Sequence, residues 1–168
     1  RLNNEDKQRS GGRIIYGAAL ARIFQPGSAA QKEACRDMLG CLGEADNSLS
    51  PWLALTMVAH ALVESNLFMH TINLLEDSKA SVAHGAVRML AELGKPSDLA
   101  GSRMITLLQK AKKDAPRDKI ANALGFVLPF ADIGKLEQVL AAEKDEKVRK
   151  QLEKALIVVS LGNRVIGD

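Results

Sequence analysis

Apolar residues along this chain recur at intervals of three and four, and they almost nowhere alternate with polar residues. A three-to-four spacing places apolar side chains on one face of an α-helix, whereas strict alternation is the pattern of a half-buried strand. The chain also has no Asn-Gly or Asp-Gly pair between two apolar runs, the strongest short hairpin pattern. The sequence therefore predicts an all-α fold.

Turn and capping residues divide the helical pattern into nine segments. Ser28 and Gln31 form a capping box, Asp132 and Asp145 are expected N-caps, and Gly94 is an expected helix stop. The predicted helices are 13–24, 28–42, 51–64, 66–76, 78–93, 99–113, 116–129, 132–143 and 145–161.

The predicted helices repeat as pairs. The second members align at spacings of 33, 33 and 32 residues on Leu42, Leu75, Leu108 and Leu140. The first members align on Ile15, Ala54, Val82, Ile120 and Val148. Such a repeat is typical of an α-solenoid, because one helix pair cannot bury both of its apolar faces without a neighbour. We expect a right-handed superhelix of four stacked antiparallel helix pairs and one extra helix.

The aligned apolar positions also predict the core. The residues expected to be buried are Leu42, Leu75, Leu108 and Leu140, with Val58, Leu62, Leu90, Leu124, Leu152 and Leu156.

Two first-member helices, at 82–94 and 145–156, carry a further pattern. It resembles the short HEAT-like repeats also found in bilin-lyase-type proteins, whose usual form is Asp-x-x-Val-Arg-x-x-Ala-x-x-Ala-Leu-Gly-x-Leu-Gly. The Asp and Arg of this form occur together only at Asp145 and Arg149. The resemblance implies a HEAT/armadillo-like architecture and a scaffold role, and it implies no particular activity.

The ends of the chain suggest how the repeats are organised. Residues 1–12 are polar and end in two glycines, and we expect them to be a flexible lead-in. Residues 13–168 are predicted to be a single helical-repeat domain, part of a longer array, because segment 145–161 matches a first member but has no second member after it. Its apolar residues Leu152, Leu156 and Val159 are therefore expected to meet further repeats or another molecule.

Composition excludes several classes of function. Aromatic residues are 4% of the chain, too few for a base-stacking platform. Two cysteines in 168 residues exclude a disulfide scaffold and favour a reducing compartment, so we expect a cytoplasmic protein. The longest apolar runs, such as residues 155–159, are too short to span a bilayer, and we expect no membrane partner.

Residues that could carry chemistry are few. His60, His70 and His84 have no spacing that places two metal ligands on one helical face. Cys35 and Cys41 are six residues apart, so their thiols point to different sides of a helix. The nucleophile pattern Gly-x-Ser-x-Gly is absent from the sequence. The sequence therefore predicts a non-enzymatic protein without catalytic residues, cofactor or metal.

Basic residues gather in the C-terminal part of the chain, which from residue 101 onward holds 13 basic and 9 acidic residues. They form two clusters: Lys110, Lys112, Lys113, Arg117 and Lys119, and then Lys144, Lys147, Arg149, Lys150 and Lys154. Acidic neighbours interrupt both clusters, which is typical of solvated helix faces. A nucleic-acid-binding helical-repeat module is therefore the alternative function.

The main functional hypothesis concerns the second helix of each pair. Alignment on the leucines places polar residues at two equivalent positions three residues apart, which share one helical face. The predicted partner-binding residues are His70, Asn73, Arg103, Thr106, Lys110, Lys135 and Gln138. The HEAT-like resemblance implies that second helices line a concave surface, where these residues would form a polar, mildly basic strip. We predict a protein-binding scaffold whose partner offers an acidic or amide-rich segment, with Arg103 making a bidentate carboxylate contact.

Overall fold

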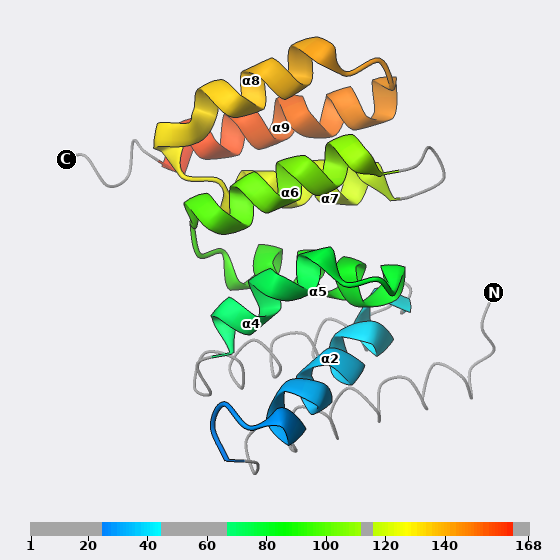
Figure 1. Ribbon diagram of the computed structural model, residues 1–168. Helices are drawn as coiled ribbons and strands as arrows, with labels where there is room; N and C mark the ends of the chain where they lie inside the picture. The colour runs from blue at the N-terminus through cyan, green and yellow to red at the C-terminus, as the bar shows by residue number, and fades with distance from the viewer. Residues whose placement is uncertain (1–24, 45–66, 112–115, 163–168) are drawn as a thin grey trace. The chain divides into compact units, whose positions relative to one another are not determined.

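The computed structural model describes residues 25–44, 67–111 and 116–162 (Figure 1). Within these ranges 83% of the residues are helical and none lies in a strand, which confirms the predicted all-α class. The chain divides into two compact units, residues 1–92 and residues 93–168.

Seven α-helices are described. The first unit holds α2 (Ala29–Glu44), α4 (Phe68–Asn73), the 3-10 turn η1 (Leu74–Glu76) and α5 (Ala80–Leu93), which ends at the unit boundary. The second unit holds α6 (Asp98–Lys110), α7 (Arg117–Val127), the 3-10 turn η2 (Phe130–Asp132), α8 (Ile133–Ala142) and α9 (Glu146–Gly162). They match seven predicted helices with ends that differ by up to three residues. The predicted helices 13–24 and 51–64 and the lead-in 1–12 lie outside the described residues.

Local capping follows the sequence at three helix ends. Before α2, Ser28 Oγ accepts a hydrogen bond from the Gln31 N–H at 3.2 Å. At the start of α9, Asp145 Oδ1 accepts hydrogen bonds from the N–H groups two and three residues on, at 2.9 and 3.2 Å. After α5, Gly94 has a φ of +56°, the left-handed conformation that typically ends a helix.

The predicted N-cap at Asp132 is wrong, since its side chain makes no capping hydrogen bond. Asp132 instead lies in η2, and the N–H of Ile133 already bonds to the carbonyl of Phe130 within that turn. A helix entered from a 3-10 turn has fewer unsatisfied N–H groups for a side chain to cap. The Asp132 carboxylate pairs with Lys135 Nζ at 2.8 Å.

Most of the predicted core positions are buried. Leu42, Leu75 and Leu90 in the first unit and Leu108, Leu124 and Leu152 in the second have at most 1% of their surface exposed. Val58 and Leu62 lie outside the described residues.

Two core predictions in the second unit are wrong, because Leu140 and Leu156 are only half-buried. In α8 the buried side is set by Leu136 and Val139, so Leu140 falls on the flank of the helix. In α9 the buried side includes Leu152 and Val159, and Leu156 lies at its margin. The expectation that Leu152 and Val159 would need a further repeat or another molecule to cover them is therefore wrong. The leucine spacing correctly predicted the helices, but it did not predict which side of α8 and α9 would be buried closely enough to place these two side chains.

In the second unit α7 and α9 run side by side in the same direction. Lys147 Nζ at the start of α9 lies 2.8 Å from Asp118 Oδ2 at the start of α7. Near the other ends, a Cβ added to Gly125 would lie 3.0 Å from the Ala155 Cα, so small residues allow the close approach. α6 packs against α7 and α8 packs against α9, which leaves an outer side on each of the four helices (Figure 1).

Candidate partner-binding surface

Three of the predicted binding residues lie along the outer side of α6. Arg103, Thr106 and Lys110 are spaced three and four apart, and so share one helical face away from the buried residues of α6. Thr106 and Lys110 are exposed and Arg103 is half-buried. The Thr106 hydroxyl donates to the Ser102 carbonyl at 3.0 Å, within its own helix. Two of these three side chains, Arg103 and Lys110, are therefore cationic groups on the outer side of α6.

Two further residues, Lys135 and Gln138, are exposed on α8. Lys135 Nζ pairs with Asp132 Oδ1 at 2.8 Å, and the Asp132 side chain is only 16% exposed. The second oxygen, Oδ2, is buried and has no hydrogen-bond partner in the structure. Lys135 therefore compensates a half-buried carboxylate, a role that the sequence analysis did not foresee.

The remaining two residues, His70 and Asn73, lie on α4 and belong to the first unit. His70 is half-buried, and its Nε2 lies 3.1 Å from the carbonyl oxygen of Lys32 on α2. Burial lowers the pKa of His70 below its usual value, although the bond to the Lys32 carbonyl acts in the opposite direction. The ring is therefore mainly neutral at neutral pH, and it adds little to the predicted basic character. Asn73 is exposed.

A set of contacts that sequence reasoning missed joins arginines to helix C-termini. Arg117 Nε of α7 donates to the Leu108 carbonyl of α6 at 3.3 Å, and Arg149 of α9 donates to the Leu140 carbonyl of α8 at 3.4 Å. Each arginine follows its leucine by nine residues, so the equal spacing was the available signal. Each guanidinium lies at the C-terminal end of a helix and complements the helix dipole; the Leu140 carbonyl also accepts a hydrogen bond from the Glu143 N–H at 3.3 Å.

The first unit uses arginines in a similar way. Arg88 of α5 donates to the Leu42 carbonyl of α2 at 2.6 Å. Arg36 of α2 makes two hydrogen bonds, of 2.7 and 3.1 Å, to the carboxylate of Asp77 before α5. The Arg36 hydrogen bond holds the pKa of Asp77 below its usual value, although burial acts in the opposite direction. Paired arginines thus tie neighbouring helices together rather than face a ligand.

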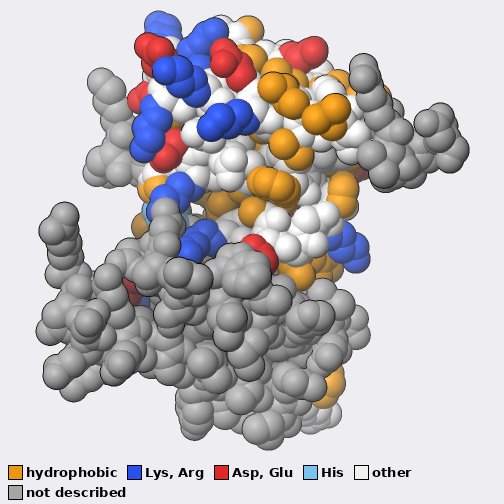
Figure 2. Space-filling view, turned by 180° about the vertical axis from the view of Figure 1, so that it is seen from behind, with side chains coloured by type: hydrophobic (Ala, Val, Ile, Leu, Met, Phe, Trp, Pro, Cys, Tyr) orange, Lys and Arg blue, Asp and Glu red, His pale blue; other side chains and the backbone are white. Residues whose placement is uncertain are grey.

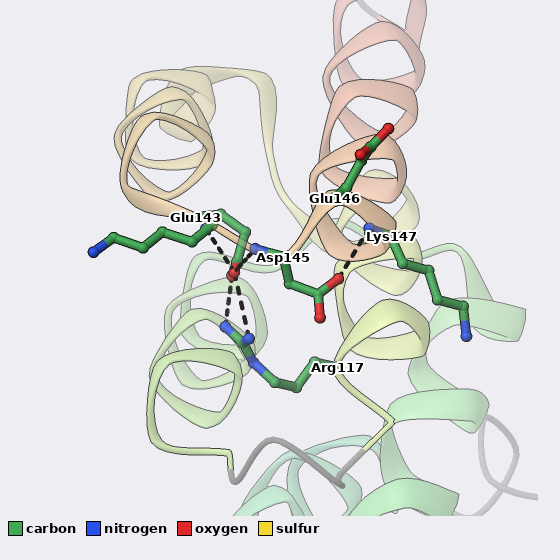
Figure 3. Close-up of a pocket in the computed structure, with 6 residues that line it drawn as sticks. Arg117, Glu143, Asp145, Glu146 and Lys147 are labelled. Atoms are coloured by element: carbon green, nitrogen blue, oxygen red, sulfur yellow. Dashed lines mark hydrogen bonds and ion pairs between the residues drawn. The ribbon is translucent and has the colours of Figure 1, made fainter.

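Glu143, in the loop between α8 and α9, is the centre of a charged cluster (Figure 3). Its carboxylate accepts two hydrogen bonds from the Arg117 guanidinium, at 2.5 and 3.4 Å, and two from the N–H groups of Lys144 and Asp145, both at 2.9 Å. Its side chain is 8% exposed. Burial raises the pKa of Glu143, but the Asp145 N–H and Arg117 outweigh it, and the pKa lies below its usual value.

An open cavity of about 440 Å³ lies beside this cluster, which raises the question whether Glu143 acts as a catalytic base or only holds the loop in place. A general base needs a pKa near the working pH and a free lone pair toward its substrate. Glu143 is ionised at neutral pH, and its carboxylate is engaged in four hydrogen bonds. The arrangement supports a structural clamp between α7 and the α8–α9 loop.

The thiols are also placed for packing rather than chemistry. Cys35 and Cys41 are both free and buried. Burial raises the pKa of Cys35 to about 12, so the thiol stays protonated at neutral pH. Among the residues that the structure describes, no group of three or more His, Cys, Asp or Glu is arranged to hold a metal ion. His60, which the sequence analysis considered as a ligand, lies outside that part of the chain.

Comparison with known proteins gives no relative whose function could be transferred to this chain. The chain matches no protein-family model, no curated protein and no solved structure. No helix in the described ranges has the length and apolar character to cross a membrane. The HEAT-like resemblance therefore rests on the repeat spacing and on the pattern in α5 and α9.

Proposed function

We propose that this chain is a non-enzymatic protein-binding scaffold built from HEAT-like helix pairs stacked as an α-solenoid. The packing within the second unit supports this proposal. In the second unit α7 and α9 lie side by side, α6 packs against α7 and α8 packs against α9. Each second-member helix therefore packs against the first member that follows it in the chain, and the predicted packing of α7 with α8 as a pair is wrong. Helix pairs that stack in this way bury a shared core and leave a continuous surface along the second helices.

The observation that carries the proposal is the exposure of equivalent polar positions on α6 and α8. Thr106 and Gln138 occupy the same place in their repeats, and both are exposed. Lys110 and Lys135 add two exposed cations to the same sides of these helices. Ammonium and amide groups bind carboxylate and amide oxygens, so the fitting partner is an acidic or amide-rich protein segment.

The nucleic-acid alternative has weaker support, because several cations of the two basic clusters are engaged within the protein. Arg117 bonds to the Glu143 carboxylate and the Leu108 carbonyl, and Lys147 pairs with Asp118. Phosphate binding needs cations that can replace counterions along a nucleic-acid backbone. A reducing, cytoplasmic setting remains part of the proposal and accords with the two free cysteines.

The test compares partner capture by the wild-type chain and by the double variant Lys110→Glu/Gln138→Glu. Lys135 is left unchanged because without it the mostly buried Asp132 carboxylate would lose its compensating positive charge. Lys150→Glu, which reverses an exposed lysine on α9, is the control for the added negative charge. Each chain is immobilised, offered a native lysate in nuclease-treated and untreated halves, and washed at rising salt.

We expect the double variant to capture about tenfold less partner from the nuclease-treated lysate than the wild-type chain does. The control should capture as much as the wild type. Circular dichroism should show the same helicity for all three chains, since both changed residues are exposed. Full capture by the double variant would refute the assignment to α6 and α8. If the chain captures a partner only from the untreated lysate, and the captured amount falls steeply as the salt concentration of the wash rises, the nucleic-acid-binding module is favoured.

A further inference from the structure

The second unit has another exposed surface, formed by the outer sides of α7 and α9. We define the α7–α9 face by six exposed residues: Lys119 and Phe126 of α7, and Lys147, Lys154, Val158 and Leu161 of α9. On each helix these residues are spaced so that they share one side, namely seven apart on α7 and seven, four and three apart on α9. In the upper part of Figure 2, hydrophobic side chains gather at one end and charged side chains at the other.

The N-terminal half of the face, up to Lys154 at the middle of α9, is basic. Lys147 is 74% exposed and pairs with Asp118 Oδ2 at 2.8 Å, so this pair is close to neutral. Lys119 and Lys154, both exposed, supply the net positive charge. Glu153, although exposed, lies about 100° further around α9, toward the flank away from α7.

The C-terminal end of the face is apolar. Phe126 is 43% exposed, Val158 is 38% exposed and Leu161 is 52% exposed. The two helices meet here, because a Cβ at Gly125 would lie 3.4 Å from the Val158 Cβ. The apolar side chains of the two helices therefore belong to one surface. Neighbouring exposed apolar side chains of this size mark interaction sites more often than isolated ones do.

We propose that the α7–α9 face docks a helix of a partner protein that carries carboxylates at one end and large apolar side chains at the other. Such a helix meets the lysines with opposite charge and covers the apolar end, so both halves of the face are satisfied together. Since α9 has 17 residues, or about 25 Å, the partner helix needs a similar length of about 16 residues.

The arrangement argues against a second copy of the chain as the occupant. A two-fold, antiparallel overlap would place lysines against Phe126 and Leu161, which desolvates the ammonium groups without a counter-charge. A parallel overlap would place lysines against lysines. The partner helix therefore comes from a different protein. This inference goes beyond the proposed function, because it concerns a different face, and either can fail alone.

The experiment selects binders from a display library of random peptides of about 16 residues, with the full 168-residue chain as the target. We expect the enriched peptides to share acidic residues at one end and Leu, Ile or Phe at helical spacing at the other. The affinity of one enriched peptide is then measured by fluorescence anisotropy. Two variants test the two ends: Lys119→Glu/Lys154→Glu and Val158→Ser/Leu161→Ser.

Each double variant is expected to weaken peptide binding by about tenfold or more. The controls are Lys32→Glu and Leu99→Ser, which change an exposed lysine on α2 and a 41% exposed leucine on α6 and should leave the affinity unchanged. Enriched peptides without this pattern, or equal affinity for the variants, would overturn the proposal. So would a sedimentation result in which Val158→Ser/Leu161→Ser converts a dimer to a monomer. If the wild-type chain binds phosphatidylserine vesicles and Val158→Ser/Leu161→Ser abolishes this binding, the face binds a membrane and the proposal is overturned as well.

Discussion

Replacement of Gly85 by alanine is expected to destabilise the first unit, because α2 and α5 approach each other there without side chains between them. A Cβ at Gly85 would collide with the carbonyl oxygen of Leu39 and lie 2.6 Å from its carbonyl carbon. On the other helix, a Cβ at Gly43 would collide with the carbonyl oxygen of Ser81. Both obstacles are backbone atoms, so no side-chain rotation can relieve them.

The magnitude follows from two opposing effects. Alanine in place of glycine inside a helix gains about 1 kcal/mol of helix propensity. Overpacking at a close contact costs about 1–3 kcal/mol, and more where neither neighbour can move. To admit the methyl group the two helices must separate by roughly 1 Å or more, which forfeits about a quarter to a half of the dispersion energy of the contacts along their interface. We expect Gly85→Ala to lower the free energy of unfolding by about 2 kcal/mol or more.

Urea unfolding followed by far-ultraviolet circular dichroism measures this change. Gly134→Ala is the control, because Gly134 is also a helical residue, in the first turn of α8, and nothing lies within 4 Å of its added Cβ. That variant gains the propensity without the clash, so its stability should rise by up to about 1 kcal/mol. A Gly85→Ala chain as stable as the Gly134→Ala chain would show that α2 and α5 do not approach as closely as we describe.

Three further changes test other parts of the second unit. Leu108→Ala should lower the free energy of unfolding by about 2–5 kcal/mol in urea unfolding, since Leu108 is fully buried and the cavity cannot easily collapse; an unchanged midpoint would contradict its place in the core. Glu143→Gln should lower the melting temperature at neutral pH and flatten its fall on acidification. Because the folded pKa of Glu143 is depressed, its stabilisation is present above the usual glutamate pKa and lost as pH falls through the folded value, so parallel curves would count against the Arg117 clamp. Asp145→Ala should cost about 1 kcal/mol in urea unfolding through loss of the α9 cap, whereas Asp132→Ala, which removes no cap, should cost less, and equal losses would argue against this assignment.

The sequence predicted some features of the candidate site and missed others. Helical register correctly indicated that Thr106, Lys110 and Gln138 would be exposed, because the side of a helix opposite its apolar residues faces solvent. The contact of His70 with Lys32 was not predictable, since it joins residues 38 positions apart. The contacts of Arg117 and Arg149 with helix carbonyls had one sequence signal, the equal nine-residue spacing from Leu108 and Leu140, but both arginines stand in basic clusters that suggested exposed side chains.

The sequence by itself determined the seven described helices, two of the three predicted N-caps and most of the core, because these depend on residues within a few positions of one another. Ser28 and Asp145 cap their helices through neighbouring N–H groups, and leucine spacing alone indicated that Leu108 would be buried. Only the tertiary structure decided that Leu140 would lie on a flank, since burial there depends on where α9 packs against α8. It also decided the approach of α2 and α5 at Gly85, because a glycine in a helical pattern does not reveal which backbone will lie against it.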